Sequence, residues 1–235
     1  MKLSDVMEEL ASKGNPATKK THLRHGAPEP IFGVKIGDLK PIQKKLKGQQ
    51  DLAYELYATG NSDAMYLAGL IVDGSKMTRK LLDRWVASAS WNMIAGFTVP
   101  WAAAEHPQAI AIARKWIDSK RELTATAGWA TLSSVVSTRP DAELPIDELS
   151  GLLDRVLKTL NSSANLVRYV MHNYVICCGT YVAPLADKAL ATAGKLGVVE
   201  VDMGNTDCKV PDAASYILKC RKGAAVAPKR KTTRC

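Results

Sequence analysis

The sequence predicts an all-α protein, an α-solenoid of HEAT-like antiparallel helix pairs. Between residues 49 and 197, apolar residues recur almost throughout at the spacing of one helical face. Short links rich in Gly, Asn, Ser or Pro separate these segments, and only two phenylalanines and few β-branched runs are available for a large sheet. Many short helices without a long crossover are typical of a solenoid, and an ordinary helical bundle is the alternative.

The chain before residue 49 is less regular. It predicts short helices at 2–13, 16–23 and 39–46, with a loop rich in Gly and Pro between the second and the third. Further helix starts are expected at residues that favour N-caps or first turns: Asn61 to Asp63, Thr78, Pro107, Pro145, and Ser162 or Ser163.

From Gly194 onwards the sequence predicts a loop followed by one more helix. The loop is expected to end at Pro211 and to contain extended residues at 198–201, and the helix is expected at 212–219. We therefore predict three parts: a HEAT-like domain over 1–197, an appended loop and short helix over 198–222, and a basic flexible tail over 223–235.

Composition is close to that of an ordinary globular protein. Of 235 residues, 46% are hydrophobic and 23% are charged, and no window reaches the roughly 18 uninterrupted apolar residues of a membrane span. Three of the first ten residues are acidic, in the region where a signal peptide needs an apolar core. The five cysteines include an adjacent pair, which is more typical of free thiols than of a set of disulfides. We expect a monomeric, cytoplasmic protein without a membrane partner.

The net charge of +9 lies entirely at the two ends of the chain. Residues 1–50 hold 10 Lys or Arg against 5 Asp or Glu, residues 51–218 hold 15 against 18, and residues 219–235 hold 7 against none. Basic ends on a nearly neutral body favour a nucleic-acid partner, because Lys and Arg dominate phosphate contact. A solubilising tail is the alternative.

Catalytic and metal-binding signatures are absent from the sequence. It contains no G-x-x-x-x-G-K-[ST], no G-x-G-x-x-G, no G-x-S-x-G and no C-x-x-C pair. His22 and His25 lie three residues apart among Lys19, Lys20 and Arg24, with no carboxylate nearby, so phosphate contact is preferred to metal binding. We expect neither a metal nor a cofactor.

Five tryptophans lie between residues 85 and 129, and rings of this kind beside Lys and Arg can stack on bases. For each of them, filling the helical core is the preferred interpretation. Trp91 is the exception, because it lies between Ser90 and Asn92 at a helix start, where a side chain can reach a concave surface.

Three spaced blocks of residues resemble the bacterial DNA alkylation repair family. These blocks are Phe32-Gly33-Val34 with Leu39, then LAYELYATGNSDAMYLAGLI, then DRWVASASWN. The resemblance covers roughly residues 20–190. It implies a HEAT-like α-solenoid related to alkylpurine DNA glycosylases, with duplex DNA, intact or damaged, held on a concave face.

The catalytic residues that this resemblance would imply are missing. In the family's glycosylases, S-W leads into an acidic pair that stabilises the positive charge developing on the sugar. Here Trp91 is followed by Asn92, and the second acidic position falls on Ala95 or Gly96. The family's backbone-gripping arginine would fall near Ala125. Loss of one such stabiliser costs about 10²–10³ in rate.

The resemblance also aligns the family's lesion-stacking tryptophan with His172. Together with the charge pattern, it predicts DNA-binding residues but leaves the catalytic residues unknown. The predicted DNA-binding residues are Lys20, Arg24, His25, Trp91, Asn92, Arg168, His172, Lys229, Arg230 and Lys231. A non-enzymatic HEAT-like scaffold for a protein partner is the alternative function.

Overall fold

Helices are the regular elements in residues 1–204 and 208–234, the part of the chain that the computed structural model describes. No strand occurs in these residues, and residues 198–201 lie in a loop, as expected. None of their helices is long and apolar enough to cross a membrane. The contacts divide the chain into two units, Met1–Pro107 and Gln108–Cys235. The predicted divisions after residues 197 and 222 stay predictions.

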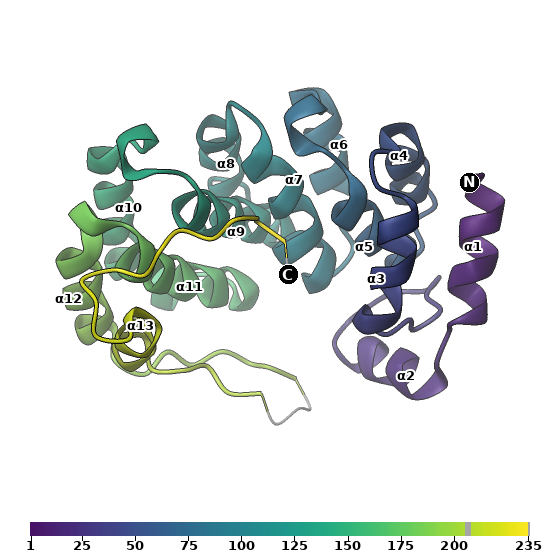
Figure 1. Cartoon of the computed structure of the whole chain (residues 1–235). Helices are drawn as coiled ribbons and strands as arrows, with labels where there is room; N and C mark the ends of the chain where they lie inside the picture. Colours follow the sequence, from purple (N-terminus) through teal and green to yellow (C-terminus); the bar gives the residue numbers. More distant parts are fainter. Residues whose placement is uncertain (205–207, 235) are drawn as a thin grey trace. The chain divides into compact units, whose positions relative to one another are not determined.

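The first unit holds seven α-helices among the described residues (Figure 1). They are α1 (Leu3–Ser12), α2 (Pro16–Arg24), α3 (Ile36–Lys45), α4 (Gln50–Ala58), α5 (Ser62–Ile71), α6 (Arg79–Ser88) and α7 (Val99–Glu105). A π-helical turn, η2 (Ile94–Thr98), leads into α7. Every residue of α5 is buried, and α5 packs against α4, η2 and α3, so this helix is the centre of the unit.

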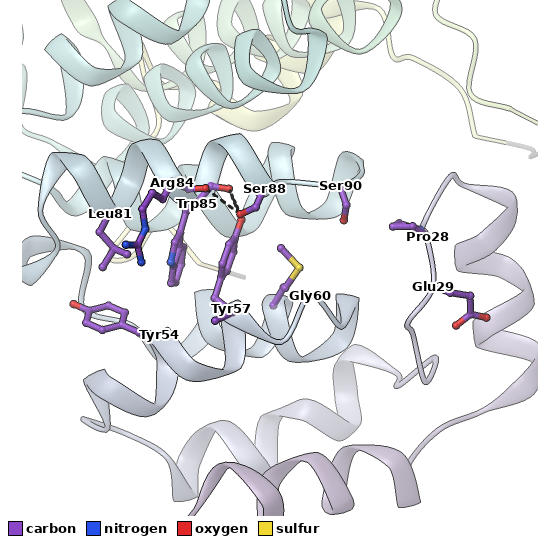
Figure 2. Close-up of a pocket in the computed structure, with 12 residues that line it drawn as sticks. Pro28, Glu29, Tyr54, Tyr57, Gly60, Leu81, Arg84, Trp85, Ser88 and Ser90 are labelled. Atoms are coloured by element: carbon purple, nitrogen blue, oxygen red, sulfur yellow. Dashed lines mark hydrogen bonds between the residues drawn. The ribbon is translucent and has the colours of Figure 1, made fainter.

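Helices α4 and α6 are joined by a stacked ring pair (Figure 2). The rings of Tyr57 and Trp85 lie 3.8 Å apart between centroids, with planes 4° apart. The Tyr57 hydroxyl donates to the Trp85 carbonyl oxygen at 2.7 Å. Burial raises the pKa of Tyr57 well above its ordinary value, so the hydroxyl stays a neutral donor.

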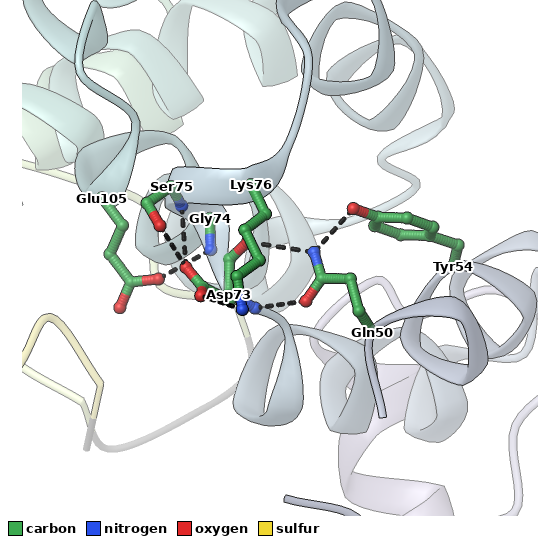
Figure 3. A network of polar contacts seen from close by, with 7 residues as sticks. All are labelled: Gln50, Tyr54, Asp73, Gly74, Ser75, Lys76 and Glu105. Atoms are coloured by element: carbon green, nitrogen blue, oxygen red, sulfur yellow. Dashed lines mark hydrogen bonds and ion pairs between the residues drawn. The ribbon is translucent and has the colours of Figure 1, made fainter. Parts of the chain in front are cut away.

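A network of hydrogen bonds joins the ends of α4, α5 and α7 (Figure 3). The Gln50 amide accepts from the Asp73 backbone N–H at 2.8 Å and donates to the Asp73 carbonyl at 3.0 Å. The Glu105 carboxylate accepts from the Gly74 N–H at 2.9 Å. A Cβ at Gly74 would meet the Ala102 carbonyl oxygen at 2.0 Å, so this close approach needs glycine.

The second unit holds six α-helices among the described residues. They are α8 (Ala109–Ile117), α9 (Glu122–Thr138), α10 (Ile146–Thr159), α11 (Asn165–Tyr181), α12 (Ala186–Leu196) and α13 (Ala213–Arg221). Helix α9 packs against α8 and α11, and α13 packs against α11 and α12. The buried rings of Trp129 and Tyr174 meet edge-on between α9 and α11, at 5.3 Å between centroids.

Some of the predicted helix starts are wrong. Helix α3 begins at Ile36, three residues earlier than expected, and Pro107 precedes the Gln108 N-cap of α8 instead of standing in its first turn. Neither Ser162 nor Ser163 caps α11. The Glu122 carboxylate from α9 instead accepts from the Leu166 N–H at 2.8 Å, a tertiary contact that local sequence does not reveal.

Residues 224–234, which the sequence predicts to be a flexible tail, make backbone hydrogen bonds to the ends of two helices. Figure 1 shows this segment in yellow, leaving α13 and running towards α9. The Ala227 N–H donates to the Thr180 carbonyl at 2.7 Å, and the Arg230 N–H donates to the Ser137 carbonyl at 2.8 Å. Both carbonyls lie in the last turn of a helix, where no intrahelical donor remains. The segment therefore caps α11 and α9.

The Lys229 side chain completes this cap. Its Nζ donates to the Val136 carbonyl at 2.8 Å and lies 2.7 Å from Asp141 Oδ1. The two charged side chains are 22% and 28% exposed, so water screens this ion pair only in part. A cation at the C-terminus of α9 also opposes the negative end of the helix dipole.

Replacing Lys229 with Met should therefore destabilise the protein. The substitution removes a charged donor from two partly buried acceptors, which should cost about 2 kcal/mol of unfolding free energy. The melting temperature should then fall by roughly 4–8 °C. Lys231→Met, which removes the same charge from an exposed side chain, is the matched control. Equal melting temperatures for the two variants would show that the cap contributes nothing.

Candidate nucleic-acid interface

Helix α2 and its C-cap residue present three of the predicted DNA contacts to solvent. Lys20, Arg24 and His25 are exposed, and the first two are four residues apart, which places them on one helical face. Asn15 caps the helix by accepting from the Thr18 N–H at 2.9 Å. This arrangement can contact the phosphates of a nucleic acid.

The loop after α2 is held by one buried carboxylate. Asp63, in the first turn of α5, accepts from the N–H groups of Phe32 at 2.6 Å, Gly33 at 3.0 Å and Val34 at 2.9 Å. Asp63 is 4% exposed. The three donors offset the loss of water around the charge. This contact gives the Phe-Gly-Val block a structural role.

Gly33 is required in this loop for two reasons. Its φ is +80°, which side chains disfavour, and a Cβ there would meet the Lys19 backbone N at 2.5 Å. The loop therefore lies directly against the backbone of α2. Asp63 and Gly33 together fix α2 relative to α5.

Trp91 is buried, contrary to the prediction that it reaches an exposed concave surface. It is 6% exposed, and its ring lies 5.5 Å from the His22 ring between centroids. Burial lowers the pKa of His22, and the nearby Asp63 charge opposes that shift in part. Trp91 Nε1, His22 Nδ1 and Ser62 Oγ have no hydrogen-bond partner. The predicted stacking of Trp91 on DNA stays a prediction.

The segment after Trp91 offers no carboxylate. Asn92 is partly exposed, Ala95 is completely buried, and Gly96 is partly exposed in η2. A Cβ on Gly96 would lie 3.0 Å from Asn92 Oδ1.

Arg168 and His172 have structural contacts on α11. Arg168 Nη1 donates to the Glu200 carbonyl at 2.8 Å, which holds the start of the appended loop against α11. His172 is 1% exposed, and burial lowers its pKa while the charge of Asp212 opposes that shift. In this conformation His172 cannot stack on a base. Its predicted DNA contact, like that of Arg168, stays a prediction.

The three predicted contacts in the C-terminal segment divide into two kinds. Lys229 is engaged in the helix cap described above. Arg230 and Lys231 are exposed. These two cations, together with Lys20 and Arg24, are the predicted basic residues that remain accessible to phosphate.

Sequence reasoning missed Asp63, although a signal for it was present. It is the one charged residue in the apolar segment SDAMYLAGLI, and a charge inside a buried helix requires partners. Among the described residues, no group of three or more His, Cys, Asp or Glu is arranged to hold a metal ion.

Comparison with known proteins gives consistent matches. The sequence matches the family described as DNA alkylation repair enzyme over residues 6–216. It is 38% identical to Uncharacterized protein Lin0241 of Listeria innocua serovar 6a and 36% identical to Uncharacterized protein Lmo0209 of Listeria monocytogenes serovar 1/2a. Each of these matches covers 91% of this chain and 94% of the relative.

A solved structure matches with a TM-score of 0.91 and 37% identity, covering all of both chains. It is described as "A new family of proteins related to the HEAT-like repeat DNA glycosylases with affinity for branched DNA structures". The predicted HEAT-like α-solenoid fold is confirmed.

Replacing Asp63 with Ala should strongly destabilise the first unit. Three backbone N–H groups would lose their acceptor, and we expect a loss of about 3 kcal/mol. The melting temperature should fall by roughly 6–12 °C. Glu55→Ala, an exposed carboxylate on α4, is the control and should change stability by less than about 0.5 kcal/mol. A melting temperature for Asp63→Ala equal to that of the control would contradict the assigned role.

Proposed function

The chain belongs to the DNA alkylation repair enzyme family, and we propose that it binds branched DNA without excising bases. The observation that carries this proposal is the likeness, at 37% identity and a TM-score of 0.91, to proteins with affinity for branched DNA. The formal charge of +9 supports a polyanionic partner.

The proposed contacts are five exposed side chains. Lys20 and Arg24 lie on α2, His25 is its C-cap, and Arg230 and Lys231 lie in the C-terminal segment. Phosphate contacts of this kind carry no sequence information, which suits recognition of a DNA structure rather than a base sequence. Lys229 is left out because its ammonium group is held by Val136 and Asp141.

Residues 92–96, which contain no carboxylate, support the proposed absence of base excision. Release of an alkylated purine builds positive charge on the sugar, which a nearby carboxylate stabilises. Asn92 and Gly96 are neutral, and Ala95 is buried and apolar. The segment therefore lacks the electrostatic stabilisation on which excision would depend.

The binding proposal is tested with a four-way DNA junction and a linear duplex of the same sequence. The wild-type protein should bind the junction more tightly than the duplex. For Lys20→Gln combined with Arg24→Gln, the dependence of log K on log salt should become shallower by about 1.8, since each lost phosphate contact removes about 0.9. Fluorescence anisotropy over a salt series measures both quantities.

The control for this experiment removes the same net charge elsewhere. Lys158 and Lys195 are exposed on α10 and α12 and are not among the proposed contacts. Their double replacement by Gln should leave the slope unchanged. Equal affinity for junction and duplex would refute the preference for branched DNA. An equal decrease of the salt slope in both double variants would show that DNA binding depends only on the net charge of the protein.

The catalytic part of the proposal predicts little or no release of 7-methylguanine or 3-methyladenine. The appropriate measurement is single-turnover release from alkylated duplex DNA at excess protein, beside an active glycosylase of the family. Because the carboxylate is missing, we expect the rate of base release to be at least about 10²-fold lower than that of the active enzyme. Release at a rate comparable with the active enzyme would mean that catalysis uses other residues.

A further inference from the structure

A pocket of about 510 Å³ lies between α4 and α6 in the first unit. This volume is in the range of sites that bind small molecules. None of the residues proposed above to contact branched DNA lines it. Figure 2 shows Tyr54 and Arg84 at one end of the pocket, and Pro28 and Glu29 at the other.

The end of the pocket near Tyr54 carries an unneutralised cation. Arg84 is exposed, and within the part of the chain that the structure describes its guanidinium makes no hydrogen bond or ion pair. The hydroxyl oxygen of Tyr54 accepts from Gln50 Nε2 at 2.6 Å, which leaves its own proton for an acceptor. Two donors of this kind favour an anionic group, and a guanidinium is well matched to phosphate.

An unsatisfied hydroxyl lies in the same pocket. Ser90 Oγ is buried and has no hydrogen-bond partner, although such groups are nearly always paired. Ser90 and Ser88 both line the pocket, and Ser88 Oγ already donates to the Arg84 and Trp85 carbonyls. Ser90 can both donate and accept, which suits the edge of a base or a sugar hydroxyl.

Apolar and aromatic side chains form the remaining wall. The stacked pair of Tyr57 and Trp85 lies between Arg84 and Ser90, and Leu81 and Met65 add aliphatic surface (Figure 2). The Tyr57 hydroxyl is already bound to the Trp85 carbonyl, and Tyr57 and Trp85 are 4% and 3% exposed, so this part of the wall is rigid and carries no free charge.

One carboxylate belongs to the lining, at the end away from Arg84. Glu29 is paired with Lys19 at 2.8 Å and accepts from the Ile31 N–H at 3.0 Å. These contacts hold the pKa of Glu29 below its ordinary value, with the Lys19 hydrogen bond as the largest cause. Its charge is therefore balanced locally by Lys19.

We infer that this pocket binds a nucleotide with a terminal phosphate, the phosphate on Arg84 and the base along the wall between Trp85 and Ser90. The same chemistry is offered by a free mononucleotide and by the 5′-phosphorylated end of a DNA strand. The inference does not rest on the binding of branched DNA, because the two sets of residues are separate.

The test is calorimetric titration of the full chain with 2′-deoxyadenosine 5′-monophosphate and with 2′-deoxyadenosine. The nucleotide should bind saturably at millimolar concentration, and the nucleoside should bind at least about tenfold more weakly because it lacks the phosphate. Arg84→Gln should weaken nucleotide binding about tenfold, and Ser90→Ala should weaken it by a smaller factor. Arg79→Gln, an exposed arginine of α6 outside the pocket, should leave it unchanged.

A second pair of probes distinguishes the two sources of the phosphate. A short single strand with a 5′-phosphate is compared with the same strand without it, in wild type and in Arg84→Gln. An advantage for the phosphorylated strand that Arg84→Gln abolishes identifies a DNA end as a ligand. Binding of the mononucleotide without that advantage identifies the free nucleotide.

Three outcomes would overturn the inference. They are the absence of saturable nucleotide binding, nucleotide binding by Arg84→Gln within twofold of wild type, and a loss of junction binding in Arg84→Gln that equals its loss of nucleotide binding. Thermal melting of each variant confirms that it is folded. Since Arg84 is exposed, we expect Arg84→Gln to melt within roughly 2 °C of wild type.

Discussion

The first unit depends on a single buried carboxylate. Asp63 stands in a helix of which every residue is buried, and burial of an unpaired charge there would cost several kcal/mol. The three N–H groups of residues 32–34 offset that cost, and those N–H groups would otherwise lack partners in a loop that runs against α2. The carboxylate and the loop therefore require each other. The exposed face of α2, with Lys20 and Arg24, is held in place by this contact.

Helical periodicity was sufficient to predict most of the fold, because an amphipathic helix shows its buried face in its own sequence. The segments containing Leu52, Leu82 and Leu149 are helices with those residues buried. Helix α9 had no such signal, since most of its residues are buried and its sequence shows no polar face. Helix α11 starts where Glu122 of α9 supplies an acceptor, and that partner is 44 residues away in the sequence.

The candidate site was predicted less well, for the same physical reason. Charge and residue type are local properties, but exposure and pairing depend on the folded chain. Lys20 and Arg24 are exposed as a DNA contact requires, whereas Trp91 and His172 are buried and Lys229 is engaged in a helix cap. The seven cations of residues 219–235 thus overstate the number of phosphate contacts available from this segment. Arg221 is also buried, and it donates to the carbonyls of Gly179 and Ala186.

The buried carboxylate that supports the fold is not in the segment where the family resemblance places a catalytic carboxylate. A side chain at residue 96 would start from a partly exposed position, with Asn92 Oδ1 3.0 Å from its Cβ. The absence of a carboxylate there leaves the surrounding core, including the fully buried Ile94 and Ala95, intact. Asp63 is the opposite case, since its removal would leave three buried or partly buried N–H groups without an acceptor. The HEAT-like fold therefore does not depend on a carboxylate at residues 92–96, which is compatible with the proposed absence of base excision.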